Sequence, residues 1–118
     1  VMASSLDDFV AKVGGGSEVE FQETMDVIEA SYDFTAIAFS VGDVVSEAGQ
    51  NQGSCKIMAF GKLNGLSEPA TLACFGKYYT EETLGDPNGT SHGNIRAFMK
   101  GGWGCVSIEA GEALKAKN

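Results

Sequence analysis

The stretch EAGQNQGSCKIMAFGKL, residues 47–63, decides how the middle of the chain folds, because it passes from polar to apolar within a few positions. Small and polar residues dominate its first half, whereas residues 55–63 are mainly apolar, with an alternating pattern. Such an alternation is typical of a β-strand. We therefore expect a polar loop over residues 47–56 that leads directly into a strand over residues 55–63.

Two interpretations of the polar loop stay open. In the first, the loop supports itself, because Gly49 and Gly53 permit positive φ values and its amide and hydroxyl side chains can bond to nearby backbone groups. In the second, the loop holds a ligand or a partner, with Asn51, Ser54 and Lys56 as donors. The loop lacks the G-x-x-x-x-G-K-[ST] spacing, so it is not a phosphate-binding P-loop.

Helices are expected on the N-terminal side of this stretch. Ser4 followed by Asp7 predicts a short helix over residues 5–13, and Ser17 followed by Glu20 predicts the start of a second helix. One apolar stripe at helical spacing runs along the second helix, formed by Phe21, Met25, Ile28 and Tyr32.

Further helices are expected on the C-terminal side. Ser67 followed by Pro69 predicts a helix start, because proline is tolerated in the first turn. Residues 86–89, with the sequence DPNG, predict a tight turn. Ser91 is expected to cap a last helix that Gly101 ends.

The expected strands lie between these helices. Residues 36–45 predict a strand that is interrupted at Gly42 by a hairpin or a bulge. Residues 105–109 predict a closing strand, and the tail from Gly111 is expected to be a frayed helix. Strands and helices do not alternate regularly, so we expect a single α+β domain over residues 1–118, with about four helices packed on a short, mainly antiparallel sheet.

The charge of the chain is distributed unevenly. Its formal net charge is −8, and residues 1–50 contain ten acidic residues and one lysine. Binding to nucleic acid through phosphate contacts needs clustered Lys and Arg, so nucleic acid is excluded as a partner. No apolar run approaches the ~20 residues of a membrane-spanning helix, so we expect no direct membrane insertion. A protein partner with a basic surface is the natural complement.

The cysteine and histidine content argues against a metal site. Cys55, Cys74 and Cys105 show no zinc-binding spacing, and His92 is the single histidine. We therefore expect no metal and no cofactor. The odd number of cysteines favours free thiols in an intracellular, reducing compartment.

The first residues, Val1-Met2-Ala3-Ser4, place methionine second. The alternatives are a cloning remnant, another start site, or the cleavage region of a plastid transit peptide. In the last case we expect the protein in the plastid stroma or on the stromal face of the thylakoid.

Acidic residues on the second predicted helix raise an energetic question. Glu23, Asp26, Glu29 and Asp33 follow one another at helical spacing, and each like-charge pair costs about 0.2–0.5 kcal/mol. One interpretation is a solvated acidic face. In the other, bases from elsewhere compensate the charge, and Glu29 is then expected to meet Lys56 or Arg96, because it lies beside the apolar stripe.

A nucleophile–base pair is a further hypothesis for the chain. Cys55 would be the nucleophile and His92 the base, with Asn94 or Glu47 orienting the imidazole ring. Trp103 follows two glycines and is expected to cover the core rather than bind a ligand.

Several segments together resemble the HopJ type III effector family. They are TMDVIEASYDFT (24–35), EAGQNQGSCKIMAFGKL (47–63), LACFGKYY (72–79) and LGDPNGTSHGNIRAFM (84–99), the last followed by Gly102-Trp103. The resemblance covers nearly the whole chain, and it provides no established catalytic residue or cofactor to carry over to this sequence. One departure from the family pattern is Ser91, which stands where the resemblance leads us to expect an acidic residue beside His92.

Three function classes follow from these observations. The leading hypothesis is a non-catalytic protein-interaction domain, an accessory subunit docked peripherally on a large membrane complex such as a plastid photosystem. The alternative is a small-molecule-binding or enzymatic domain, and the second alternative is a secreted type III effector-like protein. The residues of the alternative site are Glu29, Glu47, Asn51, Ser54, Cys55, Lys56, His92, Asn94 and Arg96.

Overall fold

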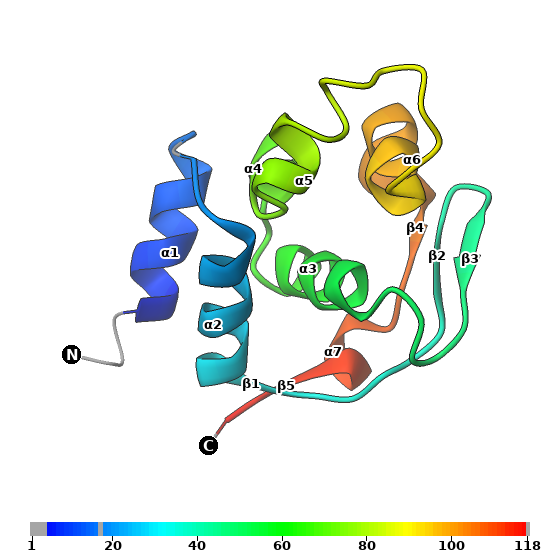
Figure 1. The fold of residues 1–118 in the computed structure, drawn as a ribbon. Helices are drawn as coiled ribbons and strands as arrows, with labels where there is room; N and C mark the ends of the chain where they lie inside the picture. The colour runs from blue at the N-terminus through cyan, green and yellow to red at the C-terminus, as the bar shows by residue number, and fades with distance from the viewer. Residues whose placement is uncertain (1–4, 17, 118) are drawn as a thin grey trace.

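The computed structural model describes residues 5–16 and 18–117, and they form a small α+β domain (Figure 1). The helix α3 lies in the middle, with α1 and α2 on one side of it and α4, α5 and α6 above it. The predicted α+β class is confirmed, and the described residues contain seven α-helices. The elements in chain order are α1 (Ser5–Gly14), α2 (Phe21–Ser31), β1 (Tyr32–Phe34), β2 (Phe39–Val41), β3 (Val44–Ser46), α3 (Gln52–Leu63), α4 (Glu68–Ala73), α5 (Lys77–Thr80), α6 (Gly93–Gly101), the 3₁₀ helix η2 (Gly102–Cys105), β4 (Val106–Ser107), α7 (Ala110–Ala113) and β5 (Leu114–Ala116).

The central helix α3 occupies the segment for which we predicted a strand, so that prediction was wrong. Ile57, Met58, Ala59 and Phe60 are consecutive and all 0% exposed. A strand would place alternate residues on opposite faces, but here every residue of the turn is covered by other elements. A helix that is buried on all sides carries no amphipathic period, so the sequence pattern does not identify it.

The N-terminal helices α1 and α2 pack beside α3. The predicted helix over residues 5–13 is confirmed as α1, whereas the predicted cap Ser17 lies outside the described residues. The helix α2 begins at Phe21, and its stripe is buried most deeply at Ile28, which is 1% exposed. The buried Thr24 hydroxyl donates to the Cys74 carbonyl at 2.8 Å, which ties α2 to the end of α4.

Two small antiparallel sheets close the fold. The strands β2 and β3 form the predicted hairpin, which turns at Gly42 with a φ of 58°, and β4 pairs with the other edge of β2. The strands β1 and β5 form the second sheet, in which Phe34 faces Leu114. The expected frayed helix after Gly111 was therefore wrong, because Leu114 is 2% exposed and anchors a paired strand.

The helices above α3 follow the predicted starts only in part. The Ser67 hydroxyl accepts from the Ala70 N–H at 3.2 Å, so the predicted cap of α4 is confirmed. The DPNG turn is also confirmed, because the Gly89 N–H donates to the Asp86 carbonyl at 3.0 Å. The predicted Ser91 cap was wrong, because α6 begins two residues later at Gly93.

Trp103 packs as a cover on the core, as predicted. Its ring meets Phe98 edge to face at 5.1 Å between centroids, and its Nε1–H donates to the Leu66 carbonyl at 2.9 Å. Among the described residues, no helix has both the length and the apolar character that crossing a membrane would require.

Candidate functional site

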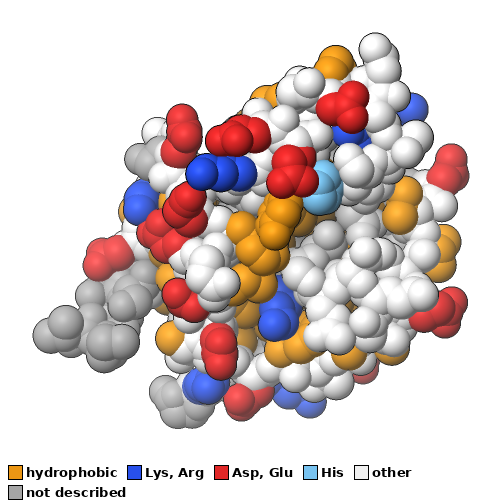
Figure 2. Space-filling view, in the orientation of Figure 1, with side chains coloured by type: hydrophobic (Ala, Val, Ile, Leu, Met, Phe, Trp, Pro, Cys, Tyr) orange, Lys and Arg blue, Asp and Glu red, His pale blue; other side chains and the backbone are white. Residues whose placement is uncertain are grey.

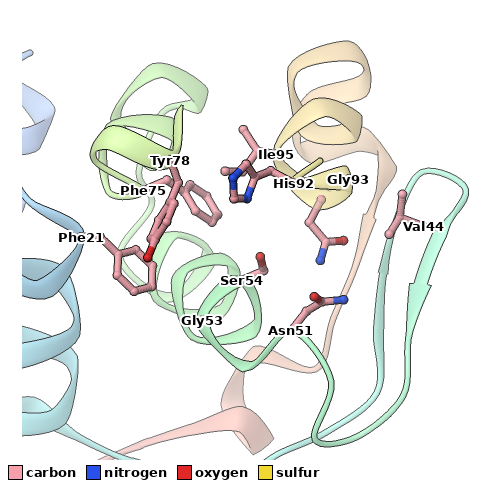
Figure 3. A pocket seen from close by; sticks show the side chains of 11 residues that line it. Phe21, Val44, Asn51, Gly53, Ser54, Phe75, Tyr78, His92, Gly93 and Ile95 are labelled. Atoms are coloured by element: carbon pink, nitrogen blue, oxygen red, sulfur yellow. The ribbon is translucent and has the colours of Figure 1, made fainter. Parts of the chain in front are cut away.

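A cavity of about 370 Å³ opens where the starts of α3 and α6 approach the aromatic side chains of α2 and α5 (Figure 3). Four of the nine predicted site residues line it. The lining residues are Phe21 of α2, Val44 of β3, Asn51, Gly53 and Ser54 at the start of α3, Phe75 before α5, Tyr78 of α5, and His92, Gly93, Asn94 and Ile95 at the start of α6.

One wall of the cavity is aromatic. The Phe21 and Tyr78 rings meet edge to face with centroids 4.9 Å apart, and Tyr78 lies 5.3 Å from the His92 ring. Figure 2 shows a band of apolar side chains beside the single histidine, while acidic side chains gather mostly on the side of α1 and α2. Such a wall offers an apolar or planar ligand a surface for stacking.

The opposite side of the cavity is formed by two helix starts. Asn51 precedes α3 and His92 precedes α6. Among the described residues other than glycine, only these two have a positive φ, at 50° and 54°. Neither residue caps its helix with a side-chain hydrogen bond. Among the described residues, no acceptor is bonded to the backbone N–H groups of residues 52–54 or 93–95, so both first turns retain free donors.

Asn94 is the most unusual residue of the lining. Its side chain is buried, with 4% of the residue exposed, and its Oδ1 atom has no hydrogen-bond partner among the described residues. Exchanging the amide oxygen and nitrogen would place an unpartnered donor at the same position. A buried amide oxygen without a partner costs about 1–3 kcal/mol, so a group that donates a hydrogen bond to Oδ1 would stabilise the protein at this position.

His92 is oriented by a residue that the sequence did not indicate. Its Nε2 atom lies 2.8 Å from Oε1 of Glu82, ten positions earlier in the turn after α5. Neither Asn94 nor Glu47 has a hydrogen bond to the imidazole among the described residues. Glu82 thus supplies the carboxylate that the family pattern led us to expect at Ser91.

Three of the remaining predicted residues lie away from the cavity. Cys55 is buried in the core at 1% exposure, and Lys56 lies over the Phe34 ring at 4.9 Å from its centroid. Glu47 is exposed in the loop before α3. Cys55 therefore does not share the cavity with His92, which removes the geometry of the nucleophile–base hypothesis.

The predicted ion pair of Glu29 with Lys56 or Arg96 is not found among the described residues. Glu29 is exposed on α2, and Figure 1 shows α2 and α6 on different sides of α3. Arg96 instead donates to the carbonyls of Ser91 and Asp86, and it lines a second hollow of about 780 Å³ that shares Val44 and Gly93 with the cavity. Two of the four acids of the stripe pair with other bases, Glu23 with Lys12 at 2.8 Å and Asp33 with Lys117 at 3.9 Å.

The polar loop before α3 supports itself and also contributes to the cavity. The side-chain Oε1 atom of Gln50 accepts from the Glu47 N–H at 2.9 Å, and the Gln52 side-chain amide donates to the Gly49 carbonyl at 3.2 Å. The Asn51 amide donates to the buried Ser46 hydroxyl at 2.8 Å. Both interpretations of the loop are thus compatible, because its first part folds on itself and its last residues line the cavity.

The thiols should react with very different rates. Native protein treated with iodoacetamide at pH 8 is expected to be modified mainly at Cys105, which is partly exposed. Burial raises the pKa of Cys55 and raises that of Cys74 to about 12, and only the thiolate reacts. Peptide mass spectrometry measures the sites, and denatured protein, in which all three thiols should react, is the control. Equal rates for the three thiols in the native protein would contradict the buried positions.

Comparisons with known proteins agree over nearly the whole chain. The model of the family described as "HopJ type III effector protein" matches residues 6–114. A solved structure described as "Crystal structure of unknown function protein VPA0580" is 47% identical, with a TM-score of 0.84 over 95% of this chain and 90% of that one. No curated protein matched.

Proposed function

From its cavity we propose that this chain, which belongs to the HopJ type III effector protein family, is a small-molecule-binding domain. The similar solved structure is of a protein of unknown function, so the proposal rests on the cavity itself. The unpartnered amide of Asn94 carries this proposal. A ligand in the cavity would supply the missing hydrogen bond, so the cost of burying the amide would be recovered on binding.

The size and lining of the cavity support a small ligand. Its volume of about 370 Å³ lies at the lower end of the roughly 300–1,000 Å³ of small-molecule sites. Such sites usually combine apolar walls with a few directed polar groups, and here Phe21 and Tyr78 face Ser54 and Asn94.

Binding is favoured over covalent catalysis by the surroundings of His92. Its imidazole is bonded to Glu82, as a general base would be, but no hydroxyl or thiol among the described residues is hydrogen-bonded to it. A nucleophile within reach of the base would be needed for covalent catalysis.

Protein binding is a second candidate function. The acidic side chains on the side of α1 and α2, visible in Figure 2, favour a basic partner. The narrower expectations of a plastid location and a photosystem subunit rest on the sequence alone and stay predictions. The effector activity in the family's name is likewise a hypothesis for this chain.

The substitution Asn94→Leu tests the ligand-binding proposal. Leucine has nearly the same shape and removes the unpartnered amide, so the free energy of unfolding of the empty protein is expected to rise by about 1–2 kcal/mol. Any compound that stabilises the wild-type protein in a thermal-shift screen of neutral, cationic and anionic small molecules should lose its effect on this variant.

The matched control is Asn64→Leu. The Asn64 amide donates to the Phe60 carbonyl at 2.9 Å and to the Tyr32 hydroxyl at 3.1 Å, so its loss should destabilise the protein by about 1 kcal/mol and leave ligand binding unchanged. If Asn94→Leu destabilises the protein as Asn64→Leu does, and no compound distinguishes Asn94→Leu from the wild type, the proposal is wrong.

A further inference from the structure

We infer that the ligand of this cavity carries an anionic oxygen group, a carboxylate or a phosphate, which binds between the starts of α3 and α6 while an apolar or aromatic body lies against Phe21 and Tyr78. This inference rests on the proposed function and names the chemical class of its ligand.

The first argument is the direction of the two helices. The helix α3 has 12 residues and α6 has nine, and the first-turn residues of both line the same cavity. A helix start bears a partial positive charge and free N–H donors, which together bind carboxylates and phosphates. Two starts that face one cavity add their fields at the same place.

The second argument is that the protein leaves this charge uncompensated. Neither α3 nor α6 has an acidic residue in its first turn. The chain contains 16 acidic residues, yet the cavity lining contains none. Glu82 lies near the rim, but its carboxylate is bonded to His92. The lining therefore contains no acidic side chain that would stabilise either helix start. The acidic group of a ligand could take that place.

The third argument is the side chain of Asn94, in the first turn of α6. Its buried amide lines the cavity without a partner. The atom without a partner is Oδ1, an acceptor, so an anionic oxygen binds here only when the amide turns over and presents its N–H₂ group as the donor. The hydroxyl of Ser54 is a further donor in the lining.

A matched series of small probes tests the charge requirement. Benzoate and phenyl phosphate carry the two anionic groups, and benzamide has the shape of benzoate without its charge. Binding to the full chain is measured by isothermal titration calorimetry and by amide NMR shifts at residues 52–54 and 93–95. We expect at least one anion to bind ten-fold or more tightly than benzamide, and the tighter anion identifies the group.

A paired substitution at Gly93 tests the position of the anionic group. A Cβ atom at Gly93 would lie 3.5 Å from Val44, an ordinary contact, so Gly93→Asp and Gly93→Asn should both fold. The aspartate would occupy the helix start with a negative charge, so it should raise the melting temperature and weaken binding of the anion at least ten-fold. Asparagine has the same shape without the charge and should retain most of the affinity.

The results separate this inference from the proposed function. Benzamide binding as tightly as the anions, no binding of either anion, or equal effects of Gly93→Asp and Gly93→Asn would overturn the inference. A neutral compound that binds the wild type and not Asn94→Leu would still support the proposed function. Failure of both tests would overturn both.

Discussion

The substitution Phe60→Ala is expected to lower the free energy of unfolding by about 3–5 kcal/mol, a large part of the stability of a domain of this size. The Phe60 ring is 0% exposed and meets Phe9 and Tyr32 edge to face, with centroids 5.9 Å and 6.2 Å away. Truncation removes these contacts and leaves a cavity that α1 and α2 cannot easily fill, because both are held by other contacts. Urea unfolding followed by circular dichroism measures the loss.

The matched control is Leu63→Ala on the same helix. Leu63 is 44% exposed, so its truncation should cost about 1 kcal/mol or less. If residues 55–63 formed a strand, Phe60 would share a face with Lys56 and Lys62 and would be the less costly of the two truncations. A smaller loss for Phe60 than for Leu63 would contradict the central position of α3.

Local features of the fold follow directly from the sequence, whereas features that depend on distant segments do not. The hairpin at Gly42, the cap at Ser67 and the turn at residues 86–89 were all predicted correctly, because a few adjacent residues determine each of them. The helix α3 was missed, because the burial of its central turn, residues 57–60, is set by helices from both ends of the chain. The strand β5 was missed for the same reason, since its partner β1 lies some 80 residues earlier.

The candidate site was likewise predicted only in part. Asn51, Ser54, His92 and Asn94 were among the predicted residues, because polar side chains beside glycines are visible in the sequence. The aromatic wall was not predicted, because Phe21 reads as part of an apolar helical stripe. The sequence pattern does not distinguish an aromatic residue of the core from one that faces a cavity. It also does not distinguish Glu82 from the other acidic residues of the surface.

A second large loss of stability is expected for Gly76→Ala, at about 3 kcal/mol or more. Gly76 has φ 59° and ψ −132°, a conformation that residues with a Cβ atom rarely adopt. A Cβ atom here would lie 2.6 Å from the backbone nitrogen of Phe21 and 3.1 Å from the carbonyl oxygen of Val19. These are backbone atoms at the start of α2, so the clash cannot be relieved by rotating a side chain.

The same substitution should also weaken ligand binding, because the start of α2 must move away and carry Phe21 with it. Chemical denaturation measures the stability, and titration with the tightest-binding small molecule measures the affinity under conditions in which the variant is folded. Gly111→Ala is the control, because no atom lies within 4 Å of its added Cβ and alanine favours the helix α7 by about 1 kcal/mol. A variant at Gly76 with wild-type stability would show that α2 and α5 do not approach each other this closely. Lost stability with unchanged affinity would show that the Phe21 ring is not needed as a wall of the site.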